Sequence, residues 1–327
     1  MKYLAALTIA AVSLANSASA AQQDTKSDSP DWSVTREYRA SAYISLLSLT
    51  IFSRSGVGSG FASMDTRRSG DERVIKLRFL AGSDPQRAHG LNRLGYIEES
   101  VREKHDCISH AYYFGVMTSS AEQSLEQAKA SLETSTGATV PYVASRASSS
   151  GDRSEYTLLY MRAPSSYSLS NAAELVHLAE ARFQVSGNHS VTKQYPSEAG
   201  PFLYTLVRAL RAGSSRVDTQ FLYNGTMFRL VVEKKPDHKA GEEFERAGLI
   251  TSAASVQQAV STIHNPQTNS QTAFRVWFDP SSADVLPLRF EFRPRSFLRL
   301  VFDAQQPARD AAAGQALSLN KVRGEGR

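Results

Sequence analysis

Residues Arg216 to Glu233 read RVDTQFLYNGTMFRLVVE, which is the pattern of a β-hairpin. Apolar residues alternate with polar ones on both sides of Asn224-Gly225. A type I′ turn needs positive φ at both central residues, and Asn followed by Gly meets that need better than other pairs. The stretch therefore predicts two antiparallel strands joined by a two-residue turn.

Three further alternating runs follow this hairpin, at residues 274–279, 286–293 and 298–303. In each run one parity is apolar and the other is largely charged, which predicts an antiparallel sheet with one buried face. Short helices could fill that face, making it core, or leave an apolar pocket suited to an acyl chain. The candidate ligand-binding residues are the aromatic residues of this face: Phe221, Tyr223, Phe228, Phe274, Phe278, Phe290, Phe292 and Phe302.

The N-terminal part of the chain predicts a second antiparallel meander. Runs rich in β-formers extend over residues 38–52 and 74–80. Gly56, Gly58 and Gly60 between them predict a flexible hairpin turn. The glycine-rich stretch does not fit G-x-S-x-G or G-x-G-x-x-G, so it indicates neither a serine nucleophile nor a dinucleotide loop.

Three segments between the meanders have apolar residues at helical spacing, at residues 119–136, 171–186 and 201–212. We expect them to lie across the concave face of one large curved sheet. The predicted fold is mainly β (α+β), a half-barrel formed by a single domain over residues 32–304. Residues 245–257 predict one more strand.

The first 20 residues have the pattern of a cleavable signal peptide. Lys2 precedes an apolar run too short to span a bilayer, and Ala18 and Ala20 occupy A-x-A positions. We expect cleavage near Ala20, export to the periplasm or the medium, and no transmembrane segment in the mature chain. Residues 21–31 predict a flexible leader, and residues 305–327, which lack aromatics, predict a disordered tail.

Charge and cysteine content narrow the function classes. The net charge of +5 over 327 residues is a mild excess and does not indicate nucleic-acid binding. Cys107 is the single cysteine, so an internal disulfide is excluded. At this length the protein can bury an adequate core without one, and we expect Cys107 to be a small buried hydrophobic residue.

Two clusters of polar residues are candidate sites. His105, Asp106, Cys107 and His110 would split between the two faces of a strand, so we predict no metal site and no cofactor there. The arginines of the last strands could recognise phosphate or carboxylate, but acidic residues share those strands. We therefore expect these arginines to form cross-strand ion pairs on a solvated face of the sheet. The arginines concerned are Arg275, Arg289, Arg293, Arg295 and Arg299.

Three segments resemble the exported bacterial family known as domain of unknown function 3108. They are the strand, glycine turn and strand at residues 44–64, the LVRALRAG helix end at 206–213 with the hairpin after it, and the 274–279, 286–289 and 298–300 strands. The resemblance covers about two thirds of the mature chain. It implies a curved antiparallel sheet similar to the half-barrels of periplasmic lipoprotein carriers, and it implies no catalytic residue.

Three functions are open at this point. The first is a non-enzymatic periplasmic protein that binds a lipid or a lipoprotein acyl chain in the concave side of its sheet. The second is an envelope structural or assembly factor that acts through contacts with other envelope proteins. The third is a hydrolase, ranked last because the sequence contains no recognisable set of nucleophile, base and orienting residue.

Overall fold

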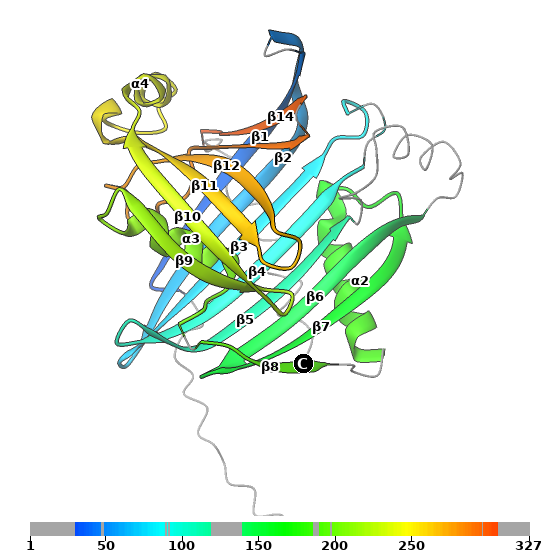
Figure 1. Ribbon diagram of the computed structural model, residues 1–327. Helices are drawn as coiled ribbons and strands as arrows, with labels where there is room; N and C mark the ends of the chain where they lie inside the picture. The colour runs from blue at the N-terminus through cyan, green and yellow to red at the C-terminus, as the bar shows by residue number, and fades with distance from the viewer. Residues whose placement is uncertain are drawn as a thin grey trace, which may run out of the picture.

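The computed structural model describes residues 30–46, 49–88, 90, 92–118, 139–185, 190–196, 198–295 and 297–306 (Figure 1). The expected signal peptide, nearly all of the leader, the helix expected at 119–136 and nearly all of the expected tail lie outside these residues.

The fold is mainly β, as predicted, and its strands form one antiparallel sheet that does not close. The two termini of the sheet-forming chain pair in its middle, where Tyr38 lies opposite Ala304, so the N-terminal and C-terminal meanders are continuous. In sheet order the strands are β8 (Val191–Gln194), β7 (Arg153–Pro164), β6 (Thr139–Ser150), β5 (Cys107–Thr118), β4 (Leu94–Lys104), β3 (Glu72–Ser83), β2 (Leu49–Ser69), β1 (Trp32–Leu46), β14 (Leu298–Ala304), β13 (Arg289–Arg295), β12 (Ser270–Phe278), β11 (Gln257–Asn265), β10 (Thr226–Pro236) and β9 (Arg216–Tyr223).

The Asn224-Gly225 hairpin is confirmed. Asn224 has φ 48° and Gly225 has φ 69°, as a type I′ turn requires, and Tyr223 pairs with Thr226 across it. The hairpin also approaches the other edge of the sheet, because the carbonyl oxygen of Gly225 accepts a hydrogen bond from Lys193 Nζ at 3.1 Å. The sheet therefore curls until its two edges nearly meet.

The predicted hairpin turn at Gly56, Gly58 and Gly60 is wrong, because all three glycines lie inside β2. The register shifts there: Ala40 pairs with Gly58 and Ser41 with Ser55. Gly56, at φ 68°, belongs to this bulge. A Cβ at Gly58 would lie 2.2 Å from the Gly82 carbonyl oxygen, so these glycines permit a bent strand and a close approach of β3.

Helix α3 (Phe202–Arg211) lies in the concave side of the sheet, as predicted. It is hydrogen-bonded to β4 through Glu99 and to β10 through Lys234, two strands far apart in the sheet order, so the sheet wraps around it. Its apolar side chains, including Leu206 and Leu210, share one core cluster with both meanders.

The other two α-helices of the described residues lie on the opposite, convex face, which corrects the expectation that the helices cross the concave face. Phe183 of α2 (Ala172–Val185) packs against Phe114, whose register partner Glu98 faces away from Glu99 and α3. Phe244 of α4 (His238–Arg246) packs with Trp277, which alternates with the concave-side Val276 and Phe278. Apolar residues on the convex face form the contacts with α2 and α4. The alternation of apolar and polar residues did not predict them, because it assigns apolar residues to one face only.

The segment that precedes β11 differs from the prediction. The expected strand at 245–257 is wrong: that segment contains the end of α4, a loop and the 3-10 turn Ala253–Ser255, and β11 begins only at Gln257. A further 3-10 turn, Leu169–Asn171, leads into α2. None of the described helices is long and apolar enough to cross a membrane.

Candidate functional site

The candidate site lies at the C-terminal end of α3 and depends on how that helix is held. At the N-terminal end, Glu99 Oε1 and Oε2 accept hydrogen bonds from the backbone nitrogens of Leu203 and Tyr204, each at 2.8 Å. Pro201 precedes the helix and has no N–H to satisfy. A carboxylate at this position satisfies two free amides and complements the helix dipole.

Glu99 has no exposed surface, and burial raises its pKa to about 7 against the lowering effect of the two backbone hydrogen bonds. Its neighbour on β4, Glu98, faces the convex side and pairs with Lys76 and Arg78, each at 3.4 Å. Adjacent carboxylates thus have different partners: cationic side chains for Glu98, and helix amides for Glu99.

From the same first turn of α3, the side chain of Tyr204 begins a polar network that extends to the mouth of the curved sheet. Tyr204 donates its hydroxyl hydrogen to Glu103, which is 5% exposed. Arg73 Nε donates to the same carboxylate, at 2.7 Å from Oε2. This ion pair anchors the Arg73 guanidinium beside the last turn of α3.

An open depression of about 380 Å³ lies at this mouth. Its lining includes three arginines and one aspartate, and the full set is Asp31, Trp32, Thr66, Arg68, Arg73, Arg211 and Ala283. Trp32 and Thr66 are register partners on β1 and β2, Arg73 comes from β3, and Arg211 ends α3. The side chains therefore come from rigid elements as well as from the segment before β1.

The electrostatics of the depression favour an anion. Burial and the positive charge of Arg73 lower the pKa of Arg211, although part of the Arg211 surface is exposed. Arg211 Nη2 donates to the Ala283 carbonyl oxygen at 2.7 Å, which fixes the guanidinium without neutralising it. Two guanidinium groups held close together raise the local potential, and a planar fork of N–H donors suits phosphate or carboxylate.

The acidic side chains at or near the depression already have partners within the protein. Asp31 Oδ2 accepts a hydrogen bond from the Arg68 backbone nitrogen at 2.6 Å, and Glu103 is paired with Arg73. Asp284, which contributes to the field at Arg211, forms an ion pair with Arg36 at 3.5 Å. The exposed Arg68 and the fixed Arg211 supply the remaining positive charge.

The eight aromatic residues singled out from the sequence do come together on one surface. Phe221, Phe278 and Phe302 are buried in the core cluster around α3, and the other five pack against it partly buried. Phe202 of α3 lies 5.0 Å from the Phe221 ring and 6.1 Å from the Phe274 ring. The helix thus occupies the side of the sheet where an acyl chain was hypothesised.

The His105–His110 segment has a structural explanation. His105 and Asp106 have φ 49° and 62° and form the tight turn between β4 and β5. Among the described residues, no group of three His, Cys, Asp or Glu side chains is placed to hold a metal ion. Cys107 is exposed, so its predicted burial is wrong: it lies directly after the turn, where the hairpin ends in solvent.

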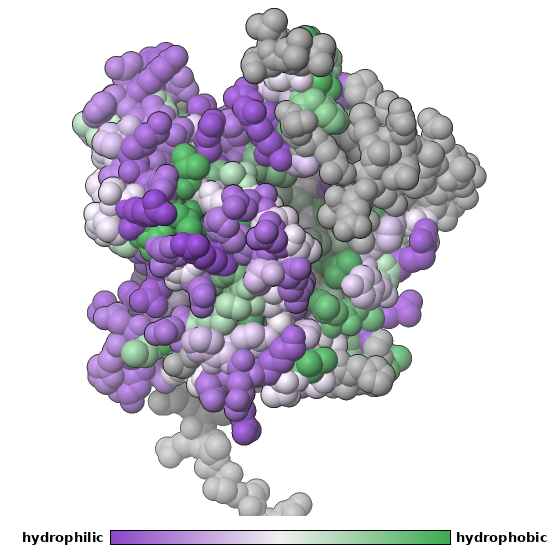
Figure 2. Space-filling model, viewed as in Figure 1, coloured by the Kyte–Doolittle hydropathy of each residue, from purple (hydrophilic) through white to green (hydrophobic). Residues whose placement is uncertain are grey.

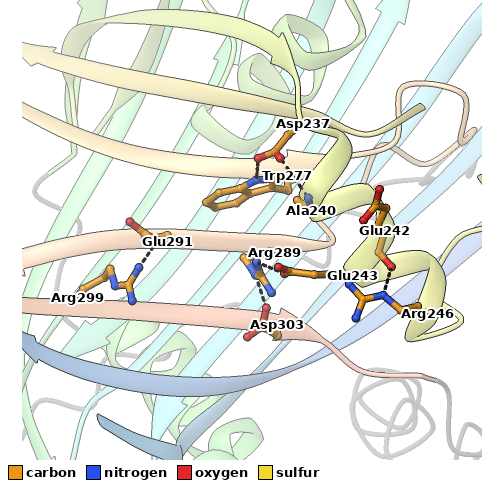
Figure 3. Close-up of polar contacts among 10 residues, drawn as sticks. All are labelled: Asp237, Ala240, Glu242, Glu243, Arg246, Trp277, Arg289, Glu291, Arg299 and Asp303. Atoms are coloured by element: carbon orange, nitrogen blue, oxygen red, sulfur yellow. Dashed lines mark hydrogen bonds and ion pairs between the residues drawn. The ribbon is translucent and has the colours of Figure 1, made fainter. Parts of the chain in front are cut away.

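Arg275, Arg289 and Arg299 form ion pairs of the predicted kind, and Figure 3 shows those of Arg289 and Arg299. Arg275 and Arg299 each lie 3.3 Å from Glu291, which is 7% exposed at its side chain. Arg289 pairs with Asp303 and with Glu243 of α4, the latter at 3.2 Å. The charge of these three arginines is balanced by carboxylates on the convex face, so they do not form a basic stripe there.

No protein-family model matches the chain, and no curated protein matches it. Among solved structures, it is similar to the crystal structure of a beta-barrel-like protein of domain of unknown function DUF1849 from Brucella abortus. The match has 11% sequence identity and a TM-score of 0.41, and covers 83% of this chain and 95% of that one. We draw no functional conclusion from a likeness of this degree. The resemblance to domain of unknown function 3108 stays a prediction.

Sequence reasoning missed the residues that line the depression. Arg68 and Arg73 lie on either side of the β2–β3 turn and Arg211 ends α3, and no motif in the sequence connects the three. Only the basic C-terminal turn of α3, with Arg208 and Arg211, was a local signal, and it has a simpler explanation in the helix dipole. Their convergence depends on where α3 lies inside the sheet.

Proposed function

We propose that the protein is an exported, non-enzymatic binding protein that holds an anionic group of its ligand in the arginine-lined depression. The observation that supports this most directly is the position of Arg211 beside Arg73: Arg73 has a carboxylate partner in Glu103, whereas Arg211 donates to the neutral Ala283 carbonyl oxygen and keeps its charge. Trp32 offers an apolar surface beside the charges. A phosphate or carboxylate attached to an apolar group is the chemistry that fits.

The proposal differs from an acyl-chain pocket on the concave side. There, α3 and the eight aromatic residues pack against one another, and the helix is held at both ends by Glu99 and Lys234. A ligand on that surface would have to displace the helix. A ligand can enter the open depression without displacing α3.

Isothermal titration calorimetry with dodecyl phosphate, pyrophosphate and the neutral dodecyl maltoside tests the proposal. Binding of the two anions, weakened about tenfold or more by Arg68→Gln and by Arg211→Gln, is expected because each removes a charge-assisted hydrogen bond. The matched control is Arg102→Gln, an exposed arginine on β4 outside the depression. If dodecyl maltoside binds as tightly as dodecyl phosphate, and neither substitution weakens its binding, the result would favour an apolar site instead.

A further inference from the structure

The far end of the β1–β2 hairpin carries exposed apolar side chains with no partner in the described chain. β3 pairs with β2 only from Gly58 to Ser69, so the part of β2 before Gly58 pairs with β1 alone. Ile51 is 63% exposed and Phe52 is 46% exposed on this projecting part. Figure 1 shows the hairpin (blue) extending past the neighbouring strands at the top of the molecule.

The next hairpin adds a third apolar residue at the same end. Phe297, between β13 and β14, is 40% exposed, and its carbonyl oxygen accepts a hydrogen bond from the Ser45 nitrogen at 2.8 Å. Hydrophobic atoms gather at the top of the space-filling view, where the β1–β2 hairpin ends (Figure 2). We call Ile51, Phe52 and Phe297 the apolar tip.

The backbone at the tip is irregular in a way that projects Ile51. Ile44 pairs with Phe52 and Ser45 pairs with Thr50, so Ile51 has no partner residue on β1. Such a bulge leaves one residue outside the ladder and re-aims its side chain. A bulge also makes this edge a poor template for adding another strand, so strand addition by a protein partner is disfavoured.

The two segments that form the tip contain arginines and no acidic residue. The sequence has no Asp or Glu from residue 38 to 64 or from residue 292 to 302, and Arg54, Arg293, Arg295 and Arg299 lie in those segments. Arg299 stacks on the Tyr43 ring at 4.3 Å and shares Glu291 with Arg275, while Arg293 is exposed. Because Arg299 is paired with Glu291, Arg54 and Arg293 are the arginines that make this apolar tip complementary to the surface of a bilayer that contains anionic lipid.

We propose that the apolar tip docks the protein on an anionic lipid surface, inserting Ile51, Phe52 and Phe297 at the level of the headgroups while the arginines contact lipid phosphates. The tip and the arginine-lined depression lie at opposite ends of the β1–β2 ladder. Trp32–Thr66 and Ile44–Phe52 are separated by 12 residues along β1, roughly 40 Å at the usual strand rise. Docking would therefore leave the depression facing away from the membrane.

Co-sedimentation of the full chain with vesicles tests this inference. Vesicles of phosphatidylglycerol and phosphatidylcholine should bind the wild type, and vesicles of phosphatidylcholine alone should bind it much less. The double variant Ile51→Ser/Phe52→Ser should lose about tenfold or more of that binding, and Arg54→Gln/Arg293→Gln should weaken both the binding and its salt dependence. All variants share the same N-terminal segment, so any contribution from it cancels.

The matched control is Tyr160→Ser/Val185→Ser, which removes the two most exposed large hydrophobic residues away from the tip, 76% and 83% exposed. Thermal unfolding monitors that every variant is folded. Equal vesicle binding by the tip and control variants would overturn the proposal. A tip substitution that changes only the oligomeric state, with no vesicle binding by the wild type, would also overturn it. Because Arg68 and Arg211 lie at the other end, their variants should bind vesicles normally whether or not the depression binds an anion.

Discussion

Glu99 and Lys234 hold the two ends of the buried helix α3. Glu99 accepts hydrogen bonds from the Leu203 and Tyr204 amides at the N-terminus, and Lys234 Nζ donates to the Ala209 and Leu210 carbonyl oxygens at 3.0 and 3.2 Å near the C-terminus. Each charge has the sign that complements its end of the helix dipole. One side chain comes from β4 and the other from β10, so the pair also connects the two meanders.

Glu99→Gln should remove a pH dependence of stability. The pKa of Glu99 is about 7 in the folded protein and near 4.5 in the unfolded chain, so the folded state binds the proton more tightly. The stabilising contribution is complete below pH 4.5 and is lost as the pH rises through about 7. Urea unfolding of both proteins between pH 4 and 8 should show the wild type losing up to about 3 kcal/mol relative to the variant. A difference that does not change with pH would contradict the assignment.

Lys234→Met should destabilise the fold at neutral pH. The ammonium group satisfies carbonyl oxygens at the end of α3, and methionine keeps the length of the side chain but cannot donate. We expect a loss of about 1–3 kcal/mol in the free energy of unfolding, measured by chemical denaturation. The neighbouring exposed Lys235→Met is the control and should be within about 0.5 kcal/mol of wild type.

Gly58→Ala should be strongly destabilising even though alanine is the smallest substitution. The new Cβ would lie 2.2 Å from the backbone oxygen of Gly82, and backbone cannot move aside as a flexible side chain can. A loss of about 2 kcal/mol or more is expected from this overpacking. Gly95→Ala, whose Cβ would have its nearest neighbour at 3.8 Å, should change the thermal midpoint little. Similar midpoints for the two variants would argue against the close contact of β2 and β3.

Glu291→Gln should weaken the convex face of the C-terminal meander. Its buried carboxylate serves both Arg275 and Arg299, and removing one charge leaves two guanidinium groups unpaired. We expect a loss of about 1–3 kcal/mol at low salt, by denaturant unfolding. Glu243→Gln is the comparison, since that carboxylate is 40% exposed and has one arginine partner; its loss should be smaller and should shrink further in salt.

Much of the sheet could be predicted from the sequence, because the alternation of apolar and polar residues and the residues of a tight turn are properties of short stretches of chain. Asn224-Gly225 specified a hairpin through the φ values of two residues, and Pro201 and Gly213 bounded a helix. Composition also excluded an internal disulfide, since Cys107 has no partner. The aromatic face was correct for the same reason: alternate residues of a strand must share a side.

The remaining features depended on distant parts of the chain. The glycines of β2 look like a turn in isolation, and only the close approach of Gly82 explains why they lie inside a strand. The sequence by itself determined the alternating strands of the C-terminal meander, the Asn224-Gly225 turn and the shared side of the aromatic residues. The tertiary structure decided that α3 lies inside the curl, that α2 and α4 lie outside it, and that Arg68, Arg73 and Arg211 meet at one mouth, because convergence from separate elements is set by packing and not by any local pattern.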